Sequence, residues 1–389
     1  MAASPPAARR APTRLRLAAV SIALAAGSLP AAAVSLEDFR DPEDGRFDTS
    51  RFLLDLNGFL PVPLIVTEPA IGYGGGAALL FFNRNAPAPG ESARTGRFTP
   101  PDITAAGGIR TENGTKAGFV GHLGFTRDGN WRYLGGVARA SLNLTYFLDA
   151  PLPGGASELG YNLDADIVVA EARRRIAGSD WHAGLRYLRA DTTSRFDSGR
   201  PDPVPARDLD VTLAGLALVV EYDDRDSIFT PGSGTRLQLQ ATDFDPRYGG
   251  DPSFRLFKAA VNSYAKPHRD VVVGGRLDFR GSSGDTPFYA VPFIELRGIP
   301  YLRYQGERVA AAEVEARWNL DGRWSLVGFG GAGRASGRDG DLGSAQTRWA
   351  GGVGVRYHLA RAMGLHAGID VARGPEESAF YLVIGSAWR

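Results

Sequence analysis

The amino-acid sequence predicts an all-β fold: a transmembrane antiparallel β-barrel of about 16 strands with one loop folded inward. Two observations carry this prediction. Apolar and polar residues alternate with a period of two along most of the chain, which is the pattern of a strand between an apolar and a wet environment. The expected strands also reach the roughly 9 to 11 residues that a tilted strand needs to cross a bilayer, whereas strands of soluble proteins average roughly 5 or 6.

The composition supports strands and turns and excludes several classes of protein. The 389 residues include 50 glycines and 25 prolines but only two methionines, which favours strands joined by turns over helices. A formal charge of +1 gives no reason to expect a nucleic-acid partner. Without cysteine there are no disulfides or thiolate metal sites. We expect no metal and no cofactor, since the histidines lack metal-ligand spacing: His122, His182, His268, His358 and His366.

The first 33 residues resemble a signal peptide. Four arginines between Arg9 and Arg16 precede the run "LAAVSIALAAGSLPAAAV", which closes on Ala31, Ala32 and Ala33. A transmembrane anchor is the alternative, but Gly27 and Pro30 shorten the apolar segment below the ~20 residues that a spanning helix needs. We therefore expect a signal peptide at 1–33, a short acidic lead at 34–51 and the barrel at 52–389, with no room for a separate soluble domain.

The strands are expected in this order because alternating segments are bounded by turn residues. In "VVVGGRLDFR", for example, Val273, Leu277 and Phe279 share one face, and charged residues occupy the other. The expected strands are 52–66, 70–83, 102–113, 115–126, 130–147, 157–176, 180–195, 209–224, 234–246, 252–267, 269–282, 306–320, 323–333, 345–359, 362–373 and 378–388.

Short and long connections alternate along this series, as in outer-membrane barrels. Tight turns such as "RDGN" and "NLDGR" define one rim, and long loops such as "FDSGRPDPVPARD" define the other. The long stretch "NRNAPAPGESARTGRFTPP" falls at the short-turn rim as an exception. Five of six tryptophans are predicted to form a girdle at the short-turn rim, and Trp349 lies near a long loop. The five are Trp131, Trp181, Trp318, Trp324 and Trp388.

Four segments in order resemble the barrel of the BamA/TamA outer-membrane assembly-factor superfamily, also called the bacterial surface antigen family. They are "LRGIP" followed by "RY", the strands "AAAEVEARWNL" and "WSLVGFGGAG", the turn "YDDRDSIFTPGSGTRL", and the C-terminal 38 residues from "GVGVRYHLARAMG" onward. The resemblance implies an integral outer-membrane barrel in a Gram-negative-type bacterium that acts in membrane-protein assembly or translocation. Members that fold substrates carry periplasmic POTRA domains, and we expect this chain to depart from them in having no room for one. The alternative is a passive or plugged pore, or a structural envelope barrel.

The resemblance also implies an inward-loop latch formed by Arg297, Gly298 and Glu315. A guanidinium inside a lumen needs an anion, and strand alternation turns Glu313, Glu315 and Asp370 inward. We expect Glu315 to be the bidentate partner, with Glu313 and Asp370 as further acceptors. A solvated loop arginine is the alternative. The superfamily's acceptor aspartate on the following strand is replaced by Gly331.

The C-terminal strand carries an expected recognition signal for the host's barrel-assembly machinery, formed by Phe380, Leu382, Ile384 and Trp388. The other expected partners are outer-membrane lipid and, by resemblance, a separately encoded periplasmic protein. The glycines of "IGYGGGAA", Gly72, Gly74, Gly75 and Gly76, are expected to weaken pairing near the seam between first and last strands.

The sequence motifs that could suggest an enzyme are better explained by structure. "GFGGAG" at 328–333 fits a dinucleotide-binding pattern, but it lies in a strand with no helix following and is interpreted as barrel wall. The acidic "DDRD" at 223–226 suggests either a cation site or a charged turn that caps its own backbone, and the turn is favoured.

Overall fold

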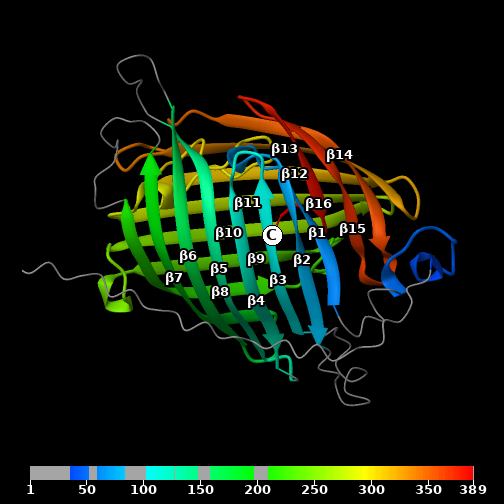
Figure 1. Ribbon diagram of the computed structural model, residues 1–389. Helices are drawn as coiled ribbons and strands as arrows, with labels where there is room; N and C mark the ends of the chain where they lie inside the picture. Colours follow the sequence, from blue (N-terminus) through cyan, green and yellow to red (C-terminus); the bar gives the residue numbers. More distant parts are fainter. Residues whose placement is uncertain are drawn as a thin grey trace, which may run out of the picture. The chain divides into compact units, whose positions relative to one another are not determined.

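The computed structural model describes residues 36–51, 59–83, 102–126, 128–147, 158–196 and 209–388. In these residues sixteen antiparallel strands pair in chain order and form one nearly closed barrel (Figure 1). The prediction of about 16 antiparallel strands is thereby confirmed. The strands are β1 (Phe59–Val66), β2 (Gly74–Asn83), β3 (Asp102–Thr111), β4 (Lys116–Phe125), β5 (Trp131–Phe147), β6 (Glu158–Arg175), β7 (Trp181–Phe196), β8 (Asp210–Asp223), β9 (Gly234–Phe244), β10 (Phe254–His268), β11 (Val271–Gly284), β12 (Arg308–Asn319), β13 (Trp324–Ser336), β14 (Arg348–Ala360), β15 (Leu365–Arg373) and β16 (Ser378–Ile384).

Short 3₁₀ helices lie in the lead and in the connections between strands: η1 (Leu36–Phe39), η2 (Pro69–Ile71), η4 (Pro246–Tyr248), η5 (Phe288–Ala290) and η6 (Arg361–Met363). In the described ranges none of the helices is both long and apolar enough to cross a membrane.

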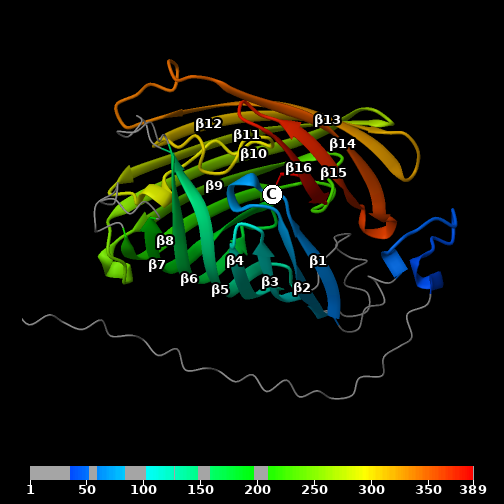
Figure 2. The ribbon, with the colours of Figure 1, turned by 45° about the horizontal axis from the view of Figure 1, so that its top comes forward.

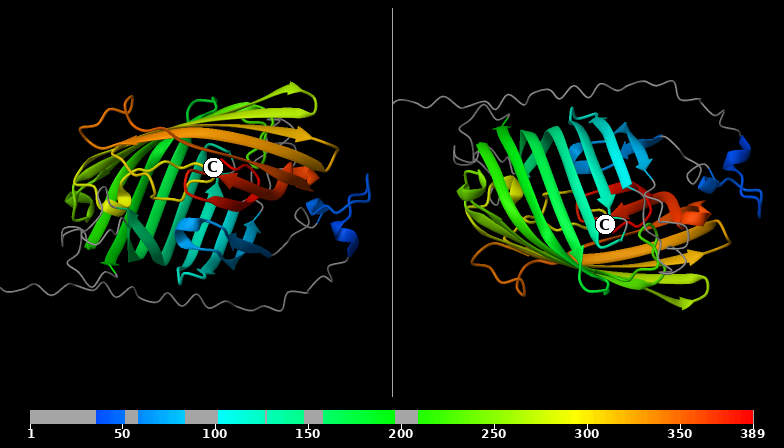
Figure 3. Two further views of the ribbon diagram at one scale, coloured as in Figure 1. Left: turned by 90° about the horizontal axis from the view of Figure 1, so that it is seen from above. Right: turned by 90° about the horizontal axis from the view of Figure 1, so that it is seen from below.

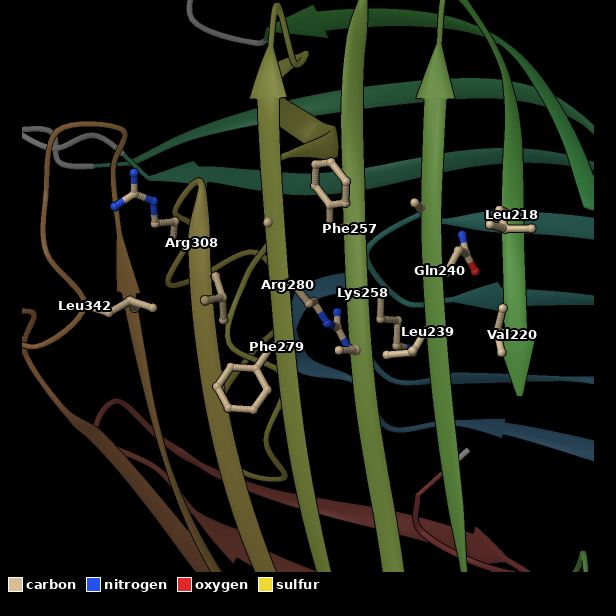
Figure 4. Close-up of a pocket in the computed structure, with 14 residues that line it drawn as sticks. Leu218, Val220, Leu239, Gln240, Phe257, Lys258, Phe279, Arg280, Arg308 and Leu342 are labelled. Atoms are coloured by element: carbon tan, nitrogen blue, oxygen red, sulfur yellow. The ribbon is translucent and has the colours of Figure 1, made fainter. Parts of the chain in front are cut away.

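The wall is apolar outside and charged inside, the reverse of a soluble protein. On β11, Phe279 is 52% exposed while its neighbour Asp278 is only 3% exposed. Strand alternation repeats this arrangement on adjacent strands, where Leu218, Leu239 and Phe257 are also exposed and line an apolar pocket together with Phe279 (Figure 4). Large apolar side chains on the outer face and charged ones in the lumen suit a barrel surrounded by lipid.

The seam between β1 and β16 is the weak point of the wall. These two strands lie in contact and are the shortest of the sixteen, yet no β-ladder joins them in the described residues. Figure 2 shows β1 and β16 next to each other. Across the seam, the ring of Tyr73 stacks on that of Phe380 with centroids 5.3 Å apart. Among the described residues, side chains therefore hold this junction, whereas hydrogen-bonded backbone joins every other pair of neighbouring strands.

Some expected boundaries need correction or lie outside the described residues. The last strand ends at Ile384 rather than 388, because Gly385 adopts φ +80° and turns the chain. The first strand is described from Phe59 onward, so residues 52–58 of the expected strand lie outside the description. The same holds for the expected insertion at 83–101, except for Asn83, which ends β2. The girdle prediction is wrong for Trp388, which is 4% exposed, whereas Trp131, Trp318 and Trp324 are exposed.

Candidate functional site in the barrel lumen

The connection between β11 and β12, residues 285–307, folds into the barrel (Figure 3). Its residues Ile294, Leu296 and Ile299 are buried against Val309 and Ala311 of β12. Near its start, Phe288 packs in a second cluster with residues of β5 and β6: Leu144, Tyr161 and Leu163. One loop therefore joins two parts of the wall that are six or more strands apart in the sheet order.

The glycines of β13 make room for this loop. A Cβ added at Gly331 would lie 2.9 Å from Leu296 Cδ2, and one at Gly333 would lie 2.6 Å from Ile294 Cγ2. Close approach of another segment is a common reason for glycine in a strand. An aspartate at position 331 would collide with Leu296, which gives a steric reason why this position departs from the pattern of the family that the sequence resembles.

Arg297 lies at the centre of three carboxylates, a group we call the lumen cluster: Arg297, Glu313, Glu315 and Asp370. Its Nε and Nη2 lie 2.8 and 2.6 Å from Glu313 Oε1, and Nη1 donates to Asp370 Oδ2 over 2.6 Å. Nη2 also lies 2.8 Å from Glu315 Oε2. The guanidinium carbon sits 3.6 Å from the centre of the Phe329 ring. With its side chain only 9% exposed, Arg297 has the paired, stacked environment that a desolvated guanidinium requires.

The ranking of acceptors differs from the sequence expectation. Two nitrogens of Arg297 engage Glu313 and only one engages Glu315, so the expected bidentate pair with Glu315 is wrong. Leu296, the residue before Arg297, packs over Gly331, and the register partner of Gly331 is Glu313, which brings Arg297 to Glu313 first. Asp370 is also held by Arg356, whose Nη2 donates to Oδ2 over 2.9 Å. The cluster is thus tied to β12, β14 and β15 at once.

Gly298 brings the loop tip to both sides of the seam. Its φ of +95° and the 3.0 Å separation of an added Cβ from the carbonyl carbon of Arg373 both require glycine. Its N–H donates to Tyr381 Oη on β16 over 2.9 Å. On the other side, the N–H of Tyr301 donates over 3.1 Å to Glu68 Oε1, which follows β1. Burial raises the pKa of the Glu68 carboxyl to about 7.

The C-terminus also turns into the lumen. The indole N–H of Trp388 donates to Glu313 Oε2 over 3.0 Å, and Tyr264 Oη lies 3.0 Å from Ser386 Oγ. Room comes from Gly274 on β11, where an added Cβ would lie 2.8 Å from the indole ring. Of the expected C-terminal signal, Phe380 and Ile384 face outward, Leu382 shares their strand parity, and Trp388 does not belong to this face.

The connection between β8 and β9, residues 224–233, reaches across the opposite, short-turn end of the lumen. Pro231 O accepts from Arg317 Nη2 on β12 at 3.4 Å, and Thr230 Oγ1 accepts from the N–H of His366 on β15 at 3.2 Å. The "DDRD" segment is internally paired, with Arg225 Nε donating to Asp223 Oδ1 over 2.8 Å. No metal-binding group of three or more candidate ligands was found within the described ranges.

A second arginine centre, missed by sequence reasoning, lies at the short-turn rim. Arg323, in the turn between β12 and β13, is fully buried among Asp41, Asp44 and Asp48 of the lead, and these four residues form the rim cluster. Arg323 Nε donates to Asp44 Oδ2 over 2.7 Å, and Nη1 donates to Asp48 Oδ2 over 2.5 Å. The hydrogen bond from Arg323 lowers the pKa of Asp44 to about 2, and these carboxylates raise the pKa of Arg323 itself. In the sequence, the three aspartates spaced three and four residues apart were the available signal for an acidic site that binds an arginine.

Backbone contacts dock the lead as well. The N–H of Thr49 donates to Leu359 O over 2.8 Å, and the N–H of Ala362 donates to Ser50 Oγ over 3.0 Å. Tyr357 Oη donates to Phe47 O over 2.7 Å. Residues 41–50 therefore form a structured attachment across two hairpin ends, rather than a simple linker.

These features define a class: a 16-stranded barrel of the outer-membrane type, with a lumen occupied by an inward loop and by its own C-terminus. Three solved structures share the fold, each with 12% sequence identity. BamA from Haemophilus ducreyi lacking POTRA domains 1-3 aligns with a TM-score of 0.52, over 84% of this chain and 69% of that one. CdiB from Escherichia coli gives 0.58 over 83% and 62%, and CdiB from Acinetobacter baumannii gives 0.52 over 84% and 59%.

The predicted resemblance to a BamA-type barrel is therefore confirmed at the level of the fold. The chain spans less than two thirds of either CdiB chain. A scan of protein-family models and a search of curated proteins found no match.

Proposed function

We propose that this chain is a BamA/TamA-superfamily barrel of the bacterial outer membrane that assists the assembly or translocation of other proteins. The observation that carries the proposal is the junction at the seam. β1 and β16 lack a joining ladder in the described residues, and the tip of the loop bearing Arg297 contacts both sides of that gap. A seam held by side chains costs less to open than a hydrogen-bonded ladder.

In this proposal the lumen cluster acts as a latch. While Arg297 remains paired with Glu313, Glu315 and Asp370, the loop tip holds Tyr381 and Glu68 in place and the seam stays shut. Release of the loop would free the edges of β1 and β16, which could then pair with a strand of a client protein or perturb the surrounding lipid.

The proposal also includes the location of the protein and its partners. The protein would reach the outer membrane after removal of a signal peptide, and host barrel-assembly machinery would insert it by recognising the outward face of β16 at Phe380, Leu382 and Ile384. Outer-membrane lipid would surround its apolar face, and a separately encoded periplasmic protein would supply any soluble module.

A disulfide across the seam tests the proposal. Because the chain has no cysteine, the double variant Tyr73→Cys/Phe380→Cys carries only the two introduced thiols. We expect liposomes containing the reduced variant to accelerate insertion of a model outer-membrane barrel protein, and oxidation to abolish the acceleration. Trp324→Cys/Tyr357→Cys is the matched control, because those rings lie 4.9 Å apart on strands that are already paired. Equal insertion rates with reduced, oxidised and empty liposomes would refute an assembly role.

The alternative is a plugged barrel with a structural role in the envelope. It is favoured by the same occupied lumen, in which the inward loop, the β8–β9 connection and Trp388 all meet the wall. Planar-bilayer conductance separates a plugged barrel from a passive pore, since an open and reproducible pore in the wild-type protein would contradict the plugged lumen.

A further inference from the structure

A pocket of about 550 Å³ lies in the mouth of the barrel at the long-loop end. Its lining includes Tyr146 on β5, residues of the inward loop and Arg348 at the start of β14. The strands β5 and β13 are eight apart in the sheet order and stand on opposite sides of the barrel (Figure 2), so a pocket that both ends of this span line lies across the mouth. A ligand would reach it from water, and the volume suits a small organic molecule.

Three arginines line this pocket, and one of them lacks a counter-ion. Arg338 Nη2 lies 3.1 Å from Glu307 Oε1. Arg303 Nε lies 3.6 Å from Glu376 Oε1. Within the described ranges the side chain of Arg348 makes neither an ion pair nor a hydrogen bond, although it is partly buried. A partly desolvated cation of this kind favours the approach of an anion.

The flat face of the Arg348 guanidinium is occupied, but its edge is available. Its Cζ lies 4.3 Å from the centre of the Tyr304 ring, and Tyr304 is itself held by the hydrogen bond from its Oη to Glu376. Stacking uses the face of a guanidinium, whereas its N–H donors lie in the plane. Since Nε is buried, the terminal nitrogens of Arg348 are the donors that a ligand in the pocket can reach.

The remaining lining favours a ligand larger than a bare anion. Gln346 is exposed, and its side-chain amide can both donate and accept. Gln305 donates through Nε2 to Phe288 O over 2.8 Å, which leaves its amide oxygen as an acceptor. Amides of this kind pair well with hydroxyl groups. The pocket therefore combines one unpaired cation with groups that recognise a hydroxylated body.

We propose that this pocket binds a soluble sugar phosphate. The phosphate binds to the edge of Arg348, because a guanidinium fork matches phosphate oxygens. The sugar hydroxyls bind to the amides of Gln305 and Gln346. Because Gln305 belongs to the inward loop, a bound ligand connects that loop to the β13–β14 hairpin. The binding does not depend on the assembly role proposed above.

Isothermal titration calorimetry on the full-length refolded protein tests the proposal. Glucose 6-phosphate, inorganic phosphate and glucose are titrated separately in phosphate-free detergent. We expect saturable binding of glucose 6-phosphate at one site per chain, at least about tenfold tighter than that of inorganic phosphate or glucose. Heat no greater than dilution with glucose 6-phosphate would overturn the proposal. Equally tight binding of inorganic phosphate would also overturn it, because the pocket would then hold only an ion.

Variants of Arg348 locate the phosphate. Arg348→Gln should weaken glucose 6-phosphate binding about tenfold or more, because it removes the charge-assisted donors. Arg348→Lys should bind with intermediate affinity and replaces the glutamine variant if that variant fails to fold by heat-modifiable gel migration. Undiminished binding by the folded variant would place the ligand elsewhere and overturn the assignment.

Two further variants separate the sugar from the phosphate and control for charge. Gln346→Ala should weaken glucose 6-phosphate binding about threefold and leave inorganic phosphate binding unchanged, since it removes one neutral hydrogen bond. Arg255→Gln is the matched control, because Arg255 lies at the same end of the barrel outside the pocket, with Nε 2.9 Å from Asp243 Oδ1. It should bind glucose 6-phosphate within about twofold of wild type. An equal loss in Arg255→Gln and Arg348→Gln would indicate a general charge effect and refute a defined site.

Discussion

The lumen cluster and the rim cluster each surround one arginine with three carboxylates, but the segment that supplies the arginine differs between them. In the lumen the arginine belongs to the inserted loop, and Glu313, Glu315 and Asp370 belong to the wall. At the rim the arginine belongs to the turn between β12 and β13, and the three aspartates belong to the lead that docks there. In both places a segment without strand structure is fixed to the barrel by charge-assisted hydrogen bonds.

The two clusters differ in which segment of the chain would be freed if the ion pairs broke. The loop of the lumen cluster contacts both sides of the seam, whereas the lead contacts the ends of the β12–β13 and β14–β15 hairpins. The lumen cluster is also further connected, since Asp370 binds Arg356 and Glu313 binds Trp388. Disruption of the lumen cluster should therefore affect the whole barrel, and disruption of the rim cluster only the lead.

The largest effect is expected from Arg297→Ala. It leaves three carboxylates without their shared cation, and breaking a buried pair from one side costs about 3–5 kcal/mol. We expect a lower unfolding midpoint in urea and raised conductance in planar bilayers.

Arg303→Ala is the control for Arg297→Ala. Arg303 lies in the same loop, but its only ion pair within the described residues is a 3.6 Å contact with Glu376, and its guanidinium otherwise lies over the rings of Phe147 and Tyr304. If Arg297→Ala left heat-modifiable migration and conductance unchanged, the latch would be ruled out.

Arg323→Gln should release the lead without unfolding the barrel. The aspartates lose their shared donor, so trypsin should cleave after Arg40 or Arg46 several times faster than in wild type, at unchanged urea midpoint. Arg269→Gln, at another short turn where Arg269 Nε lies 3.1 Å from Asp270, should leave this cleavage rate unaltered. A global loss of stability would show that the rim cluster supports the barrel itself.

A smaller effect is expected from Trp388→Phe. An aromatic ring remains, although smaller than the indole, and the hydrogen bond to Glu313 is lost, which costs about 1 kcal/mol in the free energy of unfolding. The urea midpoint should fall modestly, whereas Trp349→Phe, at an exposed tryptophan, should leave it unchanged. No difference between the two variants would mean that Trp388 contributes only packing.

The smallest effect is a pH dependence that originates at Glu68. Its folded pKa, about 7, is raised from the ordinary 4.5, so its contribution to stability is full below about pH 4.5 and declines as the pH rises through 7. Glu68→Gln should remove this part of the slope of urea midpoint against pH. Asp44 predicts no slope in this range, because its pKa is lowered and its contribution declines only as the pH falls toward about 2.

Sequence reasoning reached the fold and the arginine at the loop tip, because alternation and motif order are local signals. The inward orientation of Glu313 and Asp370 followed from strand parity alone. Two features depended on contacts between distant residues and escaped it. Arg323 occupies an ordinary turn whose partners lie about 280 residues earlier, and Trp388 leaves the strand alternation after Gly385.

The bonds of the loop tip to Tyr381 and to Glu68 have a consequence for measurement. Separation of β1 from β16 must break one of these bonds or draw the loop along with it. If the loop moves, the obstruction of the lumen moves too, and ion current should change together with the width of the seam. An electrical recording from a single barrel would then report, in real time, on an event at its lipid-facing edge.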